Sequence, residues 1–301
     1  MKKKYKVKTK IIFPENRPKL GVALSGGGAR GLAHIGVLKE LRNAGIQIDY
    51  LAGTSMGGVI AASYAAGLAP PKIEEIASSV GTISNLTQLV DPTLPKKGIL
   101  KGDKVTKLFR TYLGEKTFED LEIPLTVVTV DLNSNQEIHI SNGLIADALR
   151  ATISIPGIFI PVEKDGMRLV DGGLLNNLPV DIVRDMGADI ILAVDVGWSG
   201  IGKEKIRESN QKLISRVPLV DMALTLYETV DLFLSRQVDD KIQSIQPDFL
   251  LRPNIPPNIT SLTGYTKAKE LIAFGKEVTL PILADLRLTL NLTSDVTQSD
   301  K

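Results

Sequence analysis

The chain has 301 residues, 43% hydrophobic and 23% charged, which is ordinary for a folded globular protein. It contains no cysteine, which excludes disulfide bonds and cysteine-liganded metal sites, and its net charge of +2 gives no reason to expect a nucleic-acid partner. No apolar run approaches the ~20 residues that span a bilayer, and no Pro/Ser/Gly-rich linker divides the sequence. We therefore expect one large domain.

The first ten residues are strongly basic. They contain no acid and six lysines: Lys2, Lys3, Lys4, Lys6, Lys8 and Lys10. Only three apolar residues follow before Pro14, which does not predict a signal peptide. A flexible solvated tail is the simpler interpretation. The alternative is weak attraction to anionic lipid, to which each clustered lysine contributes about 1 kcal/mol.

Residues 20–67 have the pattern of two strand–helix units. Residues 20–25 (LGVALS) form an apolar run typical of a strand buried on both faces. After the glycine-rich segment 26–31, apolar residues recur at helical spacing until Gly45, which favours a helix end. Residues 46–52 predict a second strand, and an alanine-rich helix follows as far as Gly67. This order predicts parallel strands with right-handed crossovers and an α/β fold.

The second strand leads into the sequence Gly53-Thr54-Ser55-Met56-Gly57. This is G-x-S-x-G in the strand–turn–helix context that displays a nucleophilic serine on a sharp turn. The helix that begins after Ser55 directs its free N–H groups and the positive end of its dipole toward charge that develops at the serine. Ser55 is therefore the candidate nucleophile.

The glycines between the first strand and helix also fit a second motif. Gly26-x-Gly28-x-x-Gly31 matches the dinucleotide-binding fingerprint, which expects a ribose-binding acid about 20 residues later at the far end of the second strand. Asp49 has nearly the right sequence distance but stands at the start of that strand. The far end carries Ser55 instead, which disfavours nucleotide binding.

We favour an anion cradle for the same loop, in which glycine N–H groups converge beside Ser55. Gly27 and Gly28 are the expected donors. Arg30 can brace the loop, meet an anionic head group or form a structural ion pair, and the sequence leaves these alternatives open.

Together, GGGARG, GTSMG and the Asp171-Gly172-Gly173 motif resemble the patatin-like phospholipase family over about residues 20–186. The resemblance includes the phrases LGVALSGGGARGLAHIGVL and LVDGGLLNNLPV. It implies a three-layer α/β/α fold with a mostly parallel central sheet, and lipid acyl hydrolysis by a Ser–Asp dyad. By motif position, the nucleophile is Ser55, the base is Asp171 and the oxyanion loop is Gly26, Gly27 and Gly28.

The rest of the chain continues the alternation of elements. We expect helices over 72–80, 103–113, 143–153, 179–186, 219–238 and 265–275, and strands over 125–131, 136–140, 167–170, 189–196 and 249–251. Residues 81–101 read as a long loop, either a lid or an exposed connection. The 154–162 run could line an acyl-chain pocket or belong to the core below the site, and we expect most of it to be core. Helix 219–238 is expected to cover the sheet, with a cap helix or a partner surface as alternatives.

These assignments give the expected organisation of the chain. It comprises a basic tail (1–19), the catalytic core (20–186), the C-terminal part of the same domain (187–290), in which Pro281 kinks or restarts the last helix, and a loose polar tail (291–301).

A Ser–His–Asp triad needs an imidazole, and the chain has only His34 and His139. His34 lies on the first helix and His139 in the middle of a strand, so both are expected to be structural. A carboxylate must then accept the serine proton directly. An Asp-Gly turn is the alternative role of Asp171, and Asp195, at another strand end, is the fallback acid.

The motifs and the family resemblance together lead us to expect a serine hydrolase of lipid carboxylic esters, of the phospholipase A, lysophospholipase or esterase type. It would need neither a metal nor an organic cofactor. A cytoplasmic enzyme that makes transient contact with membrane surfaces is expected. The alternative is a regulatory or scaffold protein of the same fold with negligible hydrolase activity.

Overall fold

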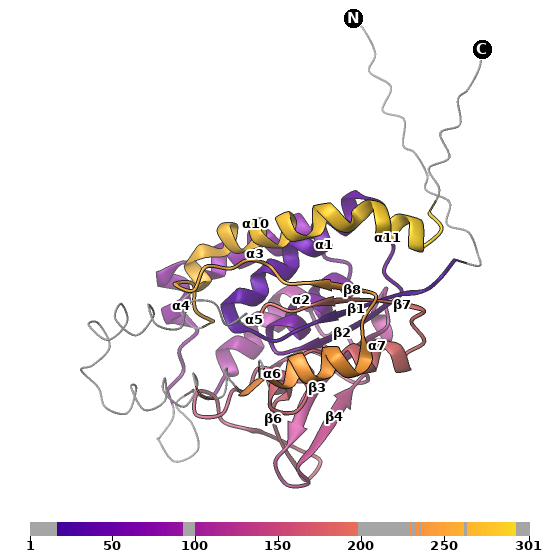
Figure 1. Ribbon diagram of the computed structural model, residues 1–301. Helices are drawn as coiled ribbons and strands as arrows, with labels where there is room; N and C mark the ends of the chain where they lie inside the picture. Colours follow the sequence, from indigo (N-terminus) through magenta and orange to yellow (C-terminus); the bar gives the residue numbers. More distant parts are fainter. Residues whose placement is uncertain are drawn as a thin grey trace, which may run out of the picture.

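The computed structural model describes residues 17–92, 100–197, 229, 233–234, 236–261 and 264–292. These residues form one eight-stranded sheet in the order β5-β6-β3-β2-β1-β7-β8, with β4 paired to the other edge of β3 (Figure 1). The five strands from β3 to β8 in this order are parallel. The strands are β1 (Leu20–Leu24), β2 (Tyr50–Thr54), β3 (Leu125–Asp131), β4 (Gln136–Ile140), β5 (Val162–Lys164), β6 (Met167–Asp171), β7 (Ile190–Val194) and β8 (Phe249–Leu251).

Helices cover both faces of this sheet. They are α1 (Ala33–Asn43), α2 (Met56–Ala65), α3 (Pro70–Val80), α4 (Ile83–Gln88), α5 (Asp103–Leu113), α6 (Ile145–Thr152), α7 (Val180–Asp185), α10 (Ala268–Thr279) and α11 (Leu283–Thr289), together with the helix of residues 236–245. Figure 1 shows α1, α3, α10 and α11 on one side of the sheet, and α7 and the orange helix 236–245 on the other. The predicted three-layer α/β/α fold with a mostly parallel sheet is confirmed.

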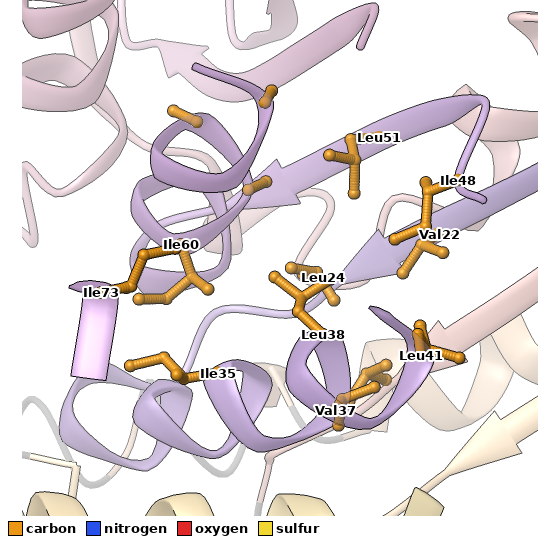
Figure 2. Packing of buried hydrophobic residues seen from close by; sticks show 14 of the residues in the cluster. Val22, Leu24, Ile35, Val37, Leu38, Leu41, Ile48, Leu51, Ile60 and Ile73 are labelled. Carbon is orange, nitrogen blue, oxygen red and sulfur yellow. The ribbon is translucent and has the colours of Figure 1, made fainter. Parts of the chain in front are cut away.

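Successive side chains of each central strand point to opposite faces of the sheet, and each face has its own hydrophobic cluster. Val22, Leu24 and Leu51 face α1 and α2, where they pack in a cluster with the buried apolar residues of both helices (Figure 2). Ala23, between Val22 and Leu24, faces the opposite way, toward α7 and Val238 of helix 236–245. Because both faces are covered, β1 is buried at all five positions, which explains its continuous apolar sequence.

Several element boundaries differ from the sequence prediction, and two have a clear physical cause. β2 begins at Tyr50 rather than at residue 46 because the Asp49 carboxylate accepts the Leu20 N–H at 2.8 Å at the end of the ladder. The last predicted helix ends at Thr279, beyond Gly275, and the chain continues through a short turn into α11. Gly275 is a helix contact rather than a helix end, since a Cβ there would lie 1.9 Å from the Ala33 carbonyl oxygen of α1.

The segment predicted as a long loop, 81–101, is helical over α4, which the Thr82 hydroxyl caps by accepting the Asn85 N–H. Helix 236–245 extends beyond the predicted end at Val238 and covers the sheet, as expected. Predictions for residues 1–16, 93–99, 198–228 and 293–301 lie outside the described residues. Within the part of the chain that is described, no helix has both the length and the apolar character to cross a membrane.

Candidate active site

One edge of β3 brings the two candidate catalytic residues together. β4 pairs with β3 along residues 127–131 and so occupies one edge of that strand. On the opposite edge, β2 ends with Thr54 paired to Val128, and β6 ends with Asp171 paired to Thr129. The two strand ends therefore meet at consecutive residues of β3, and Ser55, the residue after Thr54, lies beside Asp171.

The turn at Ser55 has a strained backbone with φ 53° and ψ −125°, a region that non-glycine residues rarely adopt. Its N–H donates to the Thr152 hydroxyl at 2.8 Å, and the Thr54 hydroxyl donates to the Asn176 carbonyl at 2.7 Å. Gly57 allows α2 to approach β1, because a Cβ there would lie 2.2 Å from the Leu24 carbonyl oxygen. These contacts hold the serine at the amino end of α2.

The turn is closely packed at its other motif positions. At Gly53, a Cβ would lie 2.6 Å from the Gly57 carbonyl carbon. Met56 supports the glycine loop, since a Cβ at Gly31 would lie 2.5 Å from the Met56 Cγ. The serine turn and the glycine loop are therefore in direct contact.

The glycine loop runs along the opposite side of Ser55. The Gly26 N–H donates to the Asn177 carbonyl oxygen at 3.1 Å, whereas the N–H groups of Gly27 and Gly28 donate no hydrogen bond within the described chain. Those two groups are thus free for a ligand oxygen. The buried Arg30 side chain donates from Nε to the Ile259 carbonyl oxygen at 3.1 Å, a contact that braces the loop.

Asp171 combines burial with two hydrogen-bond donors. Its side chain is 7% exposed, and its Oδ1 accepts the Gly173 N–H at 2.8 Å. Burial raises the pKa of Asp171 to about 6, against the opposing effect of hydrogen bonds from the Ser55 side chain and Gly173. At Gly172, a Cβ would lie 2.4 Å from the Val128 carbonyl oxygen, which keeps this segment close to β3. The result is a carboxylate of raised basicity next to a serine hydroxyl.

Ser55, Asp171 and the glycine loop line the same cavity. Its walls are formed by Gly26, Gly27, Gly28, Ser55, Ile155, Pro156, Asp171, Gly173, Leu174, Asn177, Gly197, Leu234 and Val238. The side chains apart from Ser55, Asp171 and Asn177 are apolar or absent. Ile155 and Pro156, from the run that we expected to be mostly core, thus line the cavity. The helical residues Leu234 and Val238 form another part of its wall.

The remaining candidate residues lie elsewhere. Burial lowers the pKa of His34 to about 4, and its Nε2 lies 2.9 Å from the Ser25 carbonyl oxygen. His139 bonds Glu137 at 3.1 Å on β4. Asp195 accepts from Arg252 Nε at 2.9 Å and from the Gly197 N–H. Asp49 pairs with Arg17 at the opposite end of β2, so the glycine loop lacks the acid of a dinucleotide site.

Thr152 and Asn177 belong to the site geometry, but the sequence analysis gave neither a role. Asn177 belongs to the phrase LVDGGLLNNLPV of the family resemblance, which is the one sequence feature that could have pointed to it. No sequence feature points to Thr152. No group of residues suited to a metal ion occurs within the described chain.

Comparisons with known proteins identify the family to which the chain is similar. The family model for patatin-like phospholipase matches residues 22–184. An uncharacterized NTE family protein of Mycobacterium tuberculosis is 37% identical over 195 residues, 64% of this chain and 53% of that protein. Patatin-like phospholipase domain-containing protein 6 of Mus musculus is 37% identical over 59% of this chain and 13% of its own length.

The chain thus spans about half the length, or less, of these curated relatives. Among solved structures, VipD from Legionella pneumophila has a TM-score of 0.46 at 14% identity, over 90% of this chain and 67% of that one.

Proposed function

Because the chain belongs to the patatin-like phospholipase family, we propose that it is a serine acyl hydrolase of lipid carboxylic esters, in which Ser55 is the nucleophile and Asp171 its base. At the level of the family, the expected activity is lipid acyl hydrolysis. The observation that carries the proposal is the meeting of Ser55 with a buried carboxylate of raised pKa at the wall of one cavity. No histidine lines that cavity.

In the first half of the reaction, Asp171 accepts the hydroxyl proton of Ser55 while Oγ attacks the ester carbonyl carbon. The carbonyl oxygen becomes an oxyanion that accepts hydrogen bonds from the free N–H groups of Gly27 and Gly28, at the positive end of the α2 dipole. The tetrahedral intermediate collapses, and the alcohol leaves with the proton returned by Asp171. Ser55 then carries the acyl group as an ester.

The second half repeats these steps with water. Asp171 accepts a proton from the water molecule, whose oxygen attacks the acyl carbon. The carboxylic acid is released as Ser55 recovers its proton. The apolar walls formed by Ile155, Leu174 and Leu234 suit an alkyl chain, which supports a lipid rather than a polar acyl group.

Hydrolysis of p-nitrophenyl esters with short to long acyl chains tests the proposal. We expect the wild type to turn over, and Ser55→Ala and Asp171→Asn each to lose at least about 10³-fold in kcat, as loss of a catalytic nucleophile or base does. His139→Ala is the matched control for loss of a titratable side chain outside the cavity and should keep wild-type kinetics. Activity that survives in Ser55→Ala would contradict the mechanism.

The chain-length profile separates a lipase-type enzyme from a small-ester esterase. A wild type that is inactive on these esters and on phospholipid vesicles would instead favour the regulatory or scaffold role.

A further inference from the structure

Among the described residues that line the cavity, Asn177 alone has a side chain with N–H donors. It lies between the Asp-Gly-Gly motif and α7, and its carbonyl oxygen accepts the Gly26 N–H. This bond fixes its backbone against the glycine loop. The residue is 7% exposed, so its carboxamide is enclosed almost entirely by the site.

The carboxamide oxygen of Asn177 packs between the glycine loop and the Asp-Gly-Gly motif. A Cβ at Gly26 would lie 2.4 Å from Asn177 Oδ1 and 3.2 Å from the Ser55 Cβ, and a Cβ at Gly173 would lie 3.0 Å from the same Oδ1. The oxygen end therefore contacts the two glycines, next to the nucleophile. The residue lines the cavity and its nitrogen donates no hydrogen bond within the described residues, so Nδ2 remains available to a group that enters there.

The neighbouring residue Asn176 differs from Asn177, because its amide nitrogen already donates hydrogen bonds within the chain. Asn176 Nδ2 donates to Glu137 at 2.6 Å and to Asp181 at 3.0 Å. The Asn177 carboxamide makes no hydrogen bond to any part of the chain that the structure describes. Because the residue is 7% exposed and lines the cavity, its unpartnered amide is suited to a ligand oxygen that enters there.

We propose that Asn177 contacts the substrate directly and donates an Nδ2–H to the acyl oxygen of the ester. It acts with the Gly27 and Gly28 N–H groups, and its bond strengthens as the oxygen gains charge. The inference rests on the proposed hydrolase function of Ser55. It adds a side-chain donor to a site whose other donors belong to the backbone.

The test compares the wild type with Asn177→Ala, with Asn177→Asp, which keeps the shape but lacks the N–H donor, and with Ser55→Ala. Asn133→Ala, at an exposed turn where Nδ2 bonds the Gly166 carbonyl, is the matched control. Three quantities are measured per folded molecule. They are kcat and KM on p-nitrophenyl butyrate, and the inhibition constant of an alkyl trifluoromethyl ketone, which forms a tetrahedral adduct with a serine.

We expect Asn177→Ala to lose about 10²-fold in kcat, with little change in KM and a similar weakening of ketone inhibition. Asn177→Asp should lose at least as much, because its charge also opposes the oxyanion, and it decides the test if the alanine variant does not fold. Asn133→Ala should match the wild type. A purely structural asparagine would lower the melting temperature but leave kcat and ketone inhibition per folded molecule unchanged.

Two failures are distinguishable. A wild type that hydrolyses no ester, or a Ser55→Ala variant that still does, overturns the proposed function and this inference with it. An active wild type whose Asn177 variants both keep wild-type kcat and ketone inhibition overturns only the role of Asn177.

Discussion

The backbone N–H of Ser55 donates to the hydroxyl of Thr152, 2.8 Å away at the last residue of α6. Thr152 in turn donates to the Val128 carbonyl oxygen at 2.6 Å, on the strand where β2 and β6 end. One fully buried hydroxyl thus links the nucleophile turn to β3. Because Asp171 pairs with the next residue of β3, this link also sets the position of Ser55 relative to Asp171, its proposed base.

We predict that Thr152→Val, which replaces the hydroxyl by a methyl group of similar size, lowers the free energy of unfolding by about 1–3 kcal/mol. The reason is that two buried polar groups, the Ser55 N–H and the Val128 carbonyl, lose their partner. It should also lower kcat, because the strained turn can relax. Urea unfolding and ester kinetics measure the two effects. Thr152→Ser keeps the hydroxyl and is the control; equal effects of both variants would contradict the role of the hydrogen bonds.

The ester-hydrolysis rate should depend on the protonation of Asp171. The carboxylate accepts a proton only when it is ionised, and its pKa is raised to about 6. We therefore expect kcat/KM to rise with pH through a midpoint near 6 and to level off above about pH 7. Initial rates followed at the isosbestic wavelength of p-nitrophenol measure the profile. A flat profile from about pH 5 to 8 would show that Asp171 is not the base.

The free energy of unfolding should also depend on the protonation of Asp171, but this contribution should fall as pH rises, whereas kcat/KM should increase. Burial raises the pKa of Asp171 to about 6 in the folded chain from its ordinary value of 3.8, so the folded state binds more protons between these pH values. Its contribution to the free energy of unfolding therefore falls as pH rises from about 4 to about 6, by on the order of 3 kcal/mol. Asp171→Asn should remove this fall. Urea unfolding of both proteins across the window measures it, and parallel curves would contradict the shift.

Much of the fold could be predicted because its elements have strong local signals. β1, β3 and β7 are buried nearly throughout and read as continuous apolar runs, and a glycine-rich loop separates β1 from α1. The serine turn and the glycine loop were recognisable as motifs for the same reason. Each depends on a few consecutive residues whose backbone geometry is restricted.

The contacts between segments could not be predicted, because they depend on strand register and close packing. Nothing local shows that β2 and β6 share an edge of β3, which is what brings Asp171 to Ser55. Gly275 has the sequence signal of a helix end, yet its role is to admit the backbone of α1. Asn176 and Asn177 are the same residue type, and only their surroundings separate an amide whose nitrogen is bonded within the described chain from one whose nitrogen is not.

Gly28→Ala should inactivate the enzyme. Gly28 has φ 53°, and a Cβ there would lie 2.3 Å from the Ser261 carbonyl oxygen, so the loop that offers the Gly27 and Gly28 N–H groups must shift. We expect kcat to fall by about 10²-fold or more, the scale of losing an oxyanion donor. Gly166→Ala is the control, since Gly166 has φ 77° but open space around its Cβ. It should cost about 1 kcal/mol of stability and leave kcat unchanged. Equal kcat values for the two variants would contradict the cradle.

Arg252 should anchor helix 236–245 beside the cavity. Its guanidinium bonds the buried Asp195, after β7, at 2.9 Å and Asp239, the residue after Val238, at 2.5 Å. Arg252→Met leaves the Asp195 carboxylate buried without this cation. We expect a loss of about 2 kcal/mol in the free energy of unfolding, less than for a fully buried pair because the Arg252 side chain is 39% exposed.

The matched control for this variant is Arg110→Ala, which breaks an ion pair between two exposed side chains and should change stability by less than about 0.5 kcal/mol. Adding Asp195→Asn to Arg252→Met should restore part of the loss, because no buried charge then remains. Urea unfolding of the four proteins decides the matter. If Arg252→Met is as stable as Arg110→Ala, or if Asp195→Asn deepens the loss, burial of the Asp195 charge is not what makes Arg252 necessary.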